Sequence, residues 1–188
     1  FAGVALVVSK AMNLIRPDVA LFGQKDAQQL AVIRTFVRDL DMPVRIQAVE
    51  IVRDSDGVAL SSRNQYLSEE ERVHARSLSR AIDEARAAAA LGVPLDEVLR
   101  AASSVLEAEE GVVPDYVAIV DDDDFTLLAG TGSAAEQVDK ESREKVLEAA
   151  ATQGSLRARI LLAARVGATR LIDNADVVIS VAGGARHE

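Results

Sequence analysis

The chain has 188 residues, of which 49% are hydrophobic, and its formal net charge is −9. This hydrophobic content excludes general disorder, and no apolar run approaches the length of a membrane span. The negative charge disfavours nucleic acid and anionic lipid as partners, so an anionic ligand has to be held by a local cluster of Lys and Arg. Cysteine is absent, which excludes disulfides and thiolate chemistry and fits a reducing cytoplasm. The two histidines lie far apart in the sequence, and we expect no metal site made by the protein itself.

The first part of the chain predicts alternating helices and strands. Apolar side chains at helical spacing predict a helix over residues 1–15, and a short apolar run predicts a strand over residues 19–22. A second, amphipathic helix is expected over residues 26–40 and a second strand over residues 44–52. Such elements with short links are typical of a parallel α/β sheet, and two strands are too few for that sheet to stand alone.

The second part of the chain predicts separate helices and hairpin-linked strands. A capping box of Ser68 and Glu71 predicts a helix that ends near residue 91, and another helix follows from residue 94 to about 109. A second capping box, Ser133 with Glu136, predicts a charged helix that ends near residue 151. The strands expected here cover residues 116–120, 156–166, 168–173 and 177–181. This pattern is typical of an α+β domain, and we place the domain boundary near residues 64–68.

A polar segment after the first predicted strand carries a functional signal. Gly23 lets a ligand approach the backbone, Lys25 lies at the mouth of the loop, and Asp26 is placed to cap the next helix. Gln29 lies on the same face of the first helical turn as Asp26. These features are typical of a phosphate-binding loop. A plain capped loop with a solvated Lys25 explains them as well.

A second polar segment, Leu60 to Asn64, follows the second predicted strand and a turn-forming stretch. The hydroxyls of Ser61 and Ser62 can hold phosphate oxygens, and Arg63 can bind two oxygens at once. A polar linker between domains is the alternative explanation. Segments that leave the carboxyl ends of parallel strands line the ligand crevice, so we expect a phosphate site if the two segments meet.

The two segments and several others resemble the pantothenate synthetase (pantoate–β-alanine ligase) family. The matching stretches are Phe1–Val4, Gly23–Asp26 with Gln29, Val52, Leu60–Asn64, Tyr66–Leu67 and Arg170–Asn174. Their order and spacing agree with the family pattern from the first residue to about Asn174. The Ser-Ser-Arg-Asn stretch is similar to the KMSKS-type loop of nucleotidyltransferases related to class I aminoacyl-tRNA synthetases.

For the fold, the resemblance implies two domains. Residues 1–64 would be the C-terminal portion of a Rossmann-like nucleotidyltransferase domain with a parallel sheet, and residues 65–188 a smaller α+β domain with an antiparallel sheet. Residues 131–155 are expected to be an inserted helix on the surface of the second domain. The family also has a His-x-Gly-His motif that binds the ATP phosphates, which this sequence does not contain. We therefore expect a fragment that is inactive by itself, from a protein that is a homodimer.

For the chemistry, the resemblance implies an ATP-dependent ligase. The pantoate carboxylate would attack the α-phosphorus of ATP and release pyrophosphate, and the amine of β-alanine would then displace AMP to give pantothenate. Mg²⁺ would accompany the phosphates. Pantoate would contact Gln29, and catalysis by Lys25, Ser61, Ser62 and Arg63 would rest on positioning and electrostatics. The residues that the resemblance implies as ATP contacts are Gly23, Gln24, Lys25, Asp26, Val52, Leu60, Ser61, Ser62 and Arg63.

The sequence departs from the family pattern at two positions and leaves other functions open. Gln24 stands where the family usually has Glu, and Ala27 stands where it usually has an aromatic residue. One alternative is a related nucleotidyltransferase that makes a different adenylate. The other is a non-catalytic nucleotide-binding or dimerisation module. A test of which carboxylic acid stimulates pyrophosphate release distinguishes the first alternative from the pantoate ligase. Loss of ATP binding in Lys25→Ala or Arg63→Ala would favour a true nucleotide site, and unchanged binding would count against it.

Overall fold

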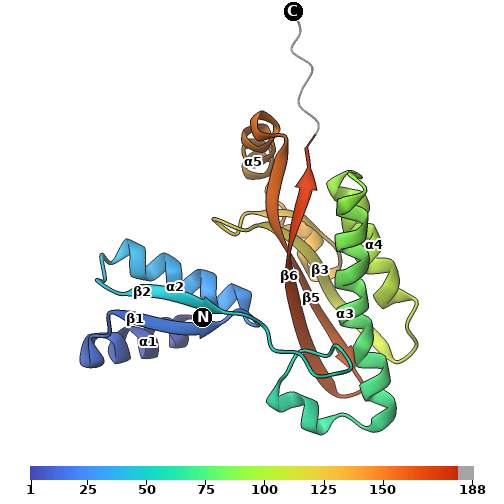
Figure 1. The fold of residues 1–188 in the computed structure, drawn as a ribbon, viewed down its shortest axis with the longest axis horizontal. Helices are drawn as coiled ribbons and strands as arrows, with labels where there is room; N and C mark the ends of the chain where they lie inside the picture. The colour runs from blue at the N-terminus through green and yellow to red at the C-terminus, as the bar shows by residue number, and fades with distance from the viewer. Residues whose placement is uncertain (182–188) are drawn as a thin grey trace, which may run out of the picture. The chain divides into compact units, whose positions relative to one another are not determined.

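The computed structural model describes residues 1–181, and the chain divides into two compact units (Figure 1). Unit 1 is Phe1–Val52, and unit 2 begins at Arg53. This division lies earlier in the chain than the boundary expected near residues 64–68, because Arg53 forms its ion pair with Asp173 inside unit 2. Within residues 1–181, no helix combines the length and the apolar character that crossing a membrane requires.

Unit 1 alternates helices and strands, as predicted. Its elements in chain order are α1 (Ala2–Ile15), β1 (Val19–Gly23), α2 (Ala27–Asp39) and β2 (Arg45–Val49). The two strands pair in parallel, with Val19 opposite Arg45 and Gly23 opposite Val49. Met12 of α1 and Ile33 of α2 pack with alternate side chains of both strands. The parallel pairing therefore brings the carboxyl ends of β1 and β2 to one edge.

Unit 2 combines an antiparallel sheet with helices, which confirms the predicted α+β character. The sheet has the strand order β4-β3-β5-β6, and every neighbouring pair is antiparallel. Helices α3 and α4 pack against each other and against the sheet (Figure 1). The elements of unit 2 are η1 (Ser62–Tyr66), α3 (Glu69–Ala90), α4 (Leu95–Glu107), β3 (Val112–Asp121), β4 (Leu127–Gly130), η2 (Gly132–Gln137), α5 (Lys140–Gln153), β5 (Ser155–Val166) and β6 (Thr169–Ser180).

Strand β6 is continuous, so the prediction of two strands over residues 168–173 and 177–181 is wrong. Polar residues lie between the two predicted strands, in the middle of β6. In the structure they keep the register, with Asn174 opposite Leu161 and Asp176 opposite Arg159. The side chain of Asn174 accepts a hydrogen bond from Arg159 at 2.9 Å, which lets a polar residue remain in the strand. Strand β4, only four residues long, was not predicted.

The charged helix of unit 2 begins later than predicted. Residues 132–137 form the short 3₁₀ helix η2, and α5 begins only at Lys140. Its cap is Asp139, whose side chain accepts the backbone N–H of Ser142 at 3.0 Å, and not the predicted capping box of Ser133 and Glu136. In contrast, the capping box of Ser68 and Glu71 at the start of α3 is confirmed. That residues 131–155 are an insertion stays a prediction.

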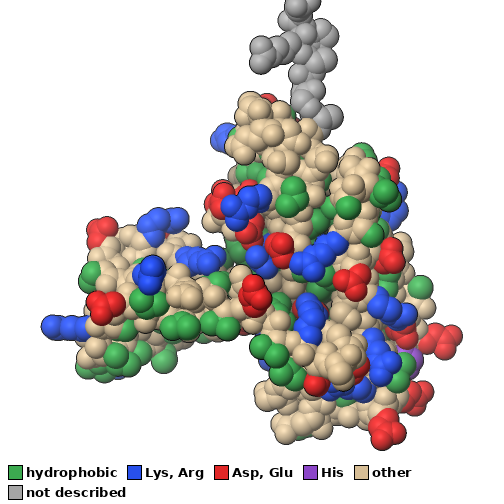
Figure 2. Space-filling model, viewed as in Figure 1, with side chains coloured by type: hydrophobic (Ala, Val, Ile, Leu, Met, Phe, Trp, Pro, Cys, Tyr) green, Lys and Arg blue, Asp and Glu red, His purple; other side chains and the backbone are tan. Residues whose placement is uncertain are grey.

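A buried ion pair anchors the start of unit 2. Asp173 of β6 is 3% exposed, and its two oxygens accept hydrogen bonds from Arg53 Nη1 at 2.6 Å and Nη2 at 2.9 Å. Arg53 Nη1 also donates to the carbonyl of Gly57 at 3.0 Å. Acidic and basic side chains are interspersed over the face of unit 2 that Figure 2 shows. Arg86 and Asp176 of unit 2 form an exposed ion pair at 2.6 Å. The Arg53–Asp173 pair differs from that pair because its carboxylate is out of contact with water.

A second polar cluster joins helix α3 to the end of α4. Glu109 binds His74 Nδ1 at 2.8 Å through Oε1, and Oε2 accepts a hydrogen bond from Arg80. The hydrogen bond with His74, followed by that with Arg80, lowers the pKa of Glu109 below its usual 4.5, although burial opposes this shift. Two residues of α3 therefore stabilise the charged form of Glu109 in the folded chain.

We expect Arg53→Ala to destabilise unit 2, because it leaves the carboxylate of Asp173 buried without its cation. Breaking a buried ion pair costs about 3–5 kcal/mol, and we expect about 2 kcal/mol because Arg53 is itself 30% exposed. Arg86→Ala is the control, since its exposed pair contributes less than about 1 kcal/mol. Urea unfolding measures both variants, and an equal loss in the two would contradict the assignment.

We expect the stability of unit 2 to fall in acid partly through Glu109. A carboxyl group with a lowered pKa in the folded state stabilises the fold at pH values above its unfolded pKa, here about 4.5. That contribution is lost as the pH falls below this value through the folded pKa. Glu109→Gln should therefore lose less stability than the unchanged chain as the pH falls below about 4.5. Parallel unfolding curves over this range would contradict the prediction.

Candidate functional site

The loop after β1 begins at the carboxyl edge of the parallel strand pair. The backbone N–H of Gln24 donates to the carbonyl of Val49 at 2.8 Å, so the loop starts beside the end of β2. Val52 follows β2 after a short connection and is 62% exposed. Ligand-binding segments of parallel α/β sheets leave the strands at this edge.

The same loop leads into the capped start of α2. Asp26 accepts the backbone N–H of Gln29 at 3.1 Å through Oδ1, which confirms the predicted cap. The other first-turn amides of a helix have no acceptor within the helix, and the helix dipole favours an anion near them. Ala27, the first residue of α2, is only 6% exposed. The loop therefore offers backbone donors next to Lys25, which is half-buried.

Gly23 lies where the described chain leaves open space. A Cβ atom added at this position would meet no atom within 4 Å. The packing of the protein therefore does not require glycine here. The open space is instead available to a ligand that approaches the backbone closely.

The second predicted segment forms the 3₁₀ helix η1 and its cap in unit 2. Ser61 Oγ accepts the backbone N–H of Arg63 at 3.2 Å, and the carbonyl of Ser61 accepts the N–H of Asn64 at 3.1 Å. Because Ser61 Oγ accepts in this bond, its own O–H remains a donor for a phosphate oxygen. Ser62 and Arg63 are exposed, and Leu60 is 46% exposed.

The side chain of Arg63 lies along the start of β6. Its Nη1 donates to the backbone carbonyl of Arg170 at 3.3 Å. A guanidinium group has five N–H donors, so this bond leaves most of them available to an anion. Arg170 itself donates from Nε to Asp115 at 2.5 Å, so its charge is compensated within the sheet. Arg63 is therefore the arginine of this region that is best placed to meet an anionic ligand.

The predicted site residues form two sets, each in its own unit. The set in unit 1 comprises Gly23, Gln24, Lys25, Asp26, Gln29 and Val52, and the set in unit 2 comprises Leu60, Ser61, Ser62 and Arg63. The members in unit 1 lie on the loop after β1, on the first turn of α2 and just after β2, and those in unit 2 are consecutive residues that lead into η1. Over residues 1–181, no group of three or more His, Asp or Glu side chains is arranged to hold a metal ion.

Two further residues belong to the surroundings of the second set. Asn64 Nδ2 donates to the carbonyl of Ala59 at 3.0 Å, whereas its Oδ1 is buried and has no partner in the part of the chain that the structure describes. Arg72 of α3 binds the carboxylates of the preceding turn. The Asp-x-Asp-Gly stretch indicated a turn in the sequence, but nothing in the sequence connected it with Arg72.

Comparison with known proteins identifies one family. The family model described as pantoate-beta-alanine ligase matches residues 1–176. The pantothenate synthetase of Rhizorhabdus wittichii is 49% identical over 175 residues, which cover 93% of this chain and 54% of that protein. The pantothenate synthetase of Saccharopolyspora erythraea is 44% identical over 186 residues, which cover 99% of this chain and 53% of that protein. The chain thus spans about half the length of these curated relatives.

Solved structures agree with this similarity. Pantothenate synthetase from Thermus thermophilus superposes with a TM-score of 0.74 at 39% identity, over 92% of this chain and 54% of that one. Pantoate-beta-alanine ligase from Francisella tularensis, solved with beta-gamma ATP and beta-alanine, gives a TM-score of 0.56 at 22% identity, over 93% of this chain and 49% of that one. The second likeness concerns the fold alone.

We expect Asp26→Ala to lower the free energy of unfolding by about 1 kcal/mol, because the N–H of Gln29 loses its acceptor. Asp26→Asn keeps an acceptor oxygen and should lose only a few tenths of a kcal/mol from the helix dipole. Asp39→Ala, at the opposite end of α2, is the control and should change stability by less than about 0.5 kcal/mol. Chemical unfolding compares the three variants, and equal effects of Asp26→Ala and Asp39→Ala would argue against the cap.

Proposed function

Because this chain belongs to the pantoate–β-alanine ligase family, we propose that it carries nucleotide-contacting loops of an ATP-dependent ligase that joins pantoate to β-alanine. The main support from the geometry is the loop of Gly23 to Asp26. It leaves β1 at the shared carboxyl edge of the strand pair and enters the capped start of α2. The chain spans about half the length of its relatives, so the complete reaction belongs to the proposal.

The proposed reaction has two displacement steps. A carboxylate oxygen of pantoate attacks the α-phosphorus of ATP, the bond to pyrophosphate breaks, and pantoyl adenylate forms. The amine of β-alanine then attacks the acyl carbon, AMP leaves, and pantothenate forms with loss of a proton from nitrogen. Neither step needs a nucleophilic side chain, so the contribution of the protein is positioning and charge stabilisation.

Each loop would contribute a different kind of contact. Gly23 and the first-turn amides of α2 would receive phosphate oxygens closely, and Lys25 would add a positive charge. Ser61 and Ser62 would donate from their hydroxyls, and Arg63 would bind two phosphate oxygens. The wider ATP contact set would be completed by Gln24, Asp26, Val52 and Leu60. The net charge of −9 makes these local cations the means of attracting ATP.

The remaining ligands follow from chemistry and from the relatives. Gln29, on the first turn of α2, would contact pantoate. Mg²⁺ would enter with the nucleotide phosphates, whose oxygens it prefers as ligands. The family model that matches residues 1–176 is described as pantoate-beta-alanine ligase, which supports pantoate and β-alanine as substrates. The family resemblance supports a homodimer, and the absence of cysteine supports a cytoplasmic location.

Nucleotide affinity tests the two cations. Lys25→Ala and Arg63→Ala should each raise the Kd of Mg-ATP about tenfold or more, because a charge-assisted hydrogen bond contributes about 1.5–3 kcal/mol. Lys10→Ala and Arg38→Ala remove exposed cations elsewhere in unit 1 and should leave the Kd unchanged. Isothermal titration calorimetry measures all four variants.

Further measurements complete the test of the proposed function. Gly23→Ala should weaken ATP binding without loss of stability, since the added Cβ meets no protein atom. Pantoate, rather than another carboxylic acid, should stimulate pyrophosphate release if the whole active site is present. The chain alone should release little AMP. NMR spectra recorded with saturating Mg-ATP should show shifts of backbone amide resonances in the two loops. The absence of such shifts in both loops would contradict the proposal.

A further inference from the structure

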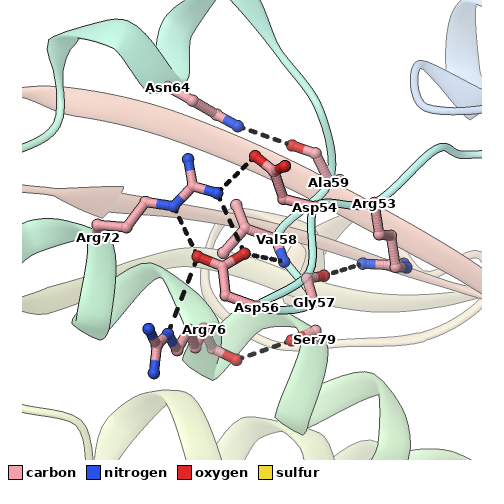
Figure 3. Close-up of polar contacts among 10 residues, drawn as sticks. All are labelled: Arg53, Asp54, Asp56, Gly57, Val58, Ala59, Asn64, Arg72, Arg76 and Ser79. Carbon is pink, nitrogen blue, oxygen red and sulfur yellow. Dashed lines mark hydrogen bonds and ion pairs between the residues drawn. The ribbon is translucent and has the colours of Figure 1, made fainter.

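A tight turn leads into the Leu60–Arg63 loop and lies against α3 (Figure 3). Asp54 donates its N–H to the carbonyl of Val58 at 2.9 Å, and Gly57 donates its N–H to the carbonyl of Asp54 at 2.9 Å. Gly57 has φ of 87°, and a Cβ atom there would come within 3.0 Å of Ser79 Oγ on α3. The turn is therefore closed within itself and in close contact with the helix.

Arg72 of α3 binds both carboxylates of this turn. Its Nε donates to Asp56 Oδ2 at 2.7 Å, and its Nη2 donates to Asp54 Oδ2 at 2.7 Å and to Asp56 Oδ1 at 3.1 Å. Figure 3 shows the guanidinium group between the two carboxylates. The side chains of Arg72 and Asp56 are 27% and 16% exposed, so the bonds between these two are partly shielded from water, whereas the side chain of Asp54 is 46% exposed. The hydrogen bond from Arg72 also lowers the pKa of Asp56 below its usual 3.8.

The turn and Asn64 together determine where the loop begins and ends. Val58 and Ala59 are buried, and Leu60 follows them directly. The carbonyl of Ala59 accepts a hydrogen bond from Asn64 Nδ2 at 3.0 Å, which closes residues 59–64 into a ring (Figure 3). A displacement of the turn would therefore move the backbone of every residue in the loop.

The ion cluster does not attract an anion by itself. The two carboxylates of the turn outnumber the charge of Arg72, and the nearby Arg76, at 3.9 Å from Asp56, only brings the cluster to neutrality. The Nε and Nη2 donors of Arg72 are already used by the carboxylates. We therefore expect an effect of Arg72 on an anionic ligand to act through the position of the loop.

We propose that Arg72 is a positioning residue for the Leu60–Arg63 loop. By holding Asp54 and Asp56, it fixes the backbone from which the side chains of the loop reach a nucleotide phosphate. The nucleotide part of this inference rests on the proposed function, whereas the loop part rests on the contacts in Figure 3 alone. Arg53 holds the turn independently through the carbonyl of Gly57, so unit 2 keeps its fold when Arg72 is changed.

Hydrogen exchange of the backbone amides tests the loop part. Arg72→Gln should speed exchange over residues 60–66 about tenfold, because three charge-assisted hydrogen bonds are lost. The control is Arg76→Gln, one helical turn further along α3, which reaches Asp56 only at 3.9 Å and should change exchange less than twofold, that is, by under about 0.5 kcal/mol. Arg72→Lys keeps the charge but not the forked geometry, so it should restore protection in part.

A double variant and ATP affinity complete the test. Asp56→Asn keeps an acceptor for the N–H of Val58 but loses the charge that Arg72 binds. Added to Arg72→Gln, it should speed exchange no further, since the two changes remove one interaction. The Kd of Mg-ATP should rise severalfold in Arg72→Gln and stay unchanged in Arg76→Gln.

The outcomes separate the two parts of the inference. Unchanged exchange over residues 60–66 in Arg72→Gln, or an equal increase throughout unit 2, would overturn the positioning role. A loosened loop with unchanged ATP affinity would overturn the nucleotide part. If the unchanged chain does not bind Mg-ATP, the proposed function fails, and the exchange data still decide whether Arg72 positions the loop.

Discussion

The local structure of the second loop depends on the pair of Arg53 and Asp173, which joins residues 120 positions apart in the sequence. A carboxylate that is 3% exposed requires a cation with matching geometry, and Arg53 supplies two parallel hydrogen bonds. The same guanidinium group binds the carbonyl of Gly57. Arg53 therefore links the turn before the loop to β6, and the hydrogen bonds of Arg72 link the same turn to α3.

The arginines near the second loop differ in whether they bind a carboxylate. Arg53, Arg72 and Arg170 each donate to a carboxylate, so their charges support the fold. Arg63 donates to a backbone carbonyl, and among residues 1–181 it has no acidic partner within ion-pair distance. In a chain with a net charge of −9, a cation without a carboxylate partner is the natural contact for an incoming anion. The carboxylate partners of Arg53, Arg72 and Arg170 thus separate these structural arginines from Arg63, which the family resemblance assigns to ATP.

Local signals predicted the helix caps at Asp26 and Ser68 and the strand pair of unit 1, because caps and apolar periodicity depend on neighbouring residues. The features that the sequence did not predict depend mostly on contacts between residues far apart in the chain. Strand β6 continues through Asp173 because Arg53, far away in the sequence, compensates its charge. Strand β4 has too few residues to show a period of its own. Similarly, the loop residues were predicted from the resemblance, whereas the contacts of Arg72 could not be predicted, because its partners meet it only after folding.

Two features of the loops remain without a use inside the described chain. Gly23 is the last residue of β1, and glycine weakens a strand. A Cβ atom at this position would meet no other atom within 4 Å, so packing does not require glycine. Asn64 keeps Oδ1 buried without a partner in the described residues, and such an atom destabilises a fold unless something binds it. One feature lies in the first loop and the other directly after the second. Packing among residues 1–181 explains neither local cost, and nucleotide binding at the two loops, as proposed, would account for both.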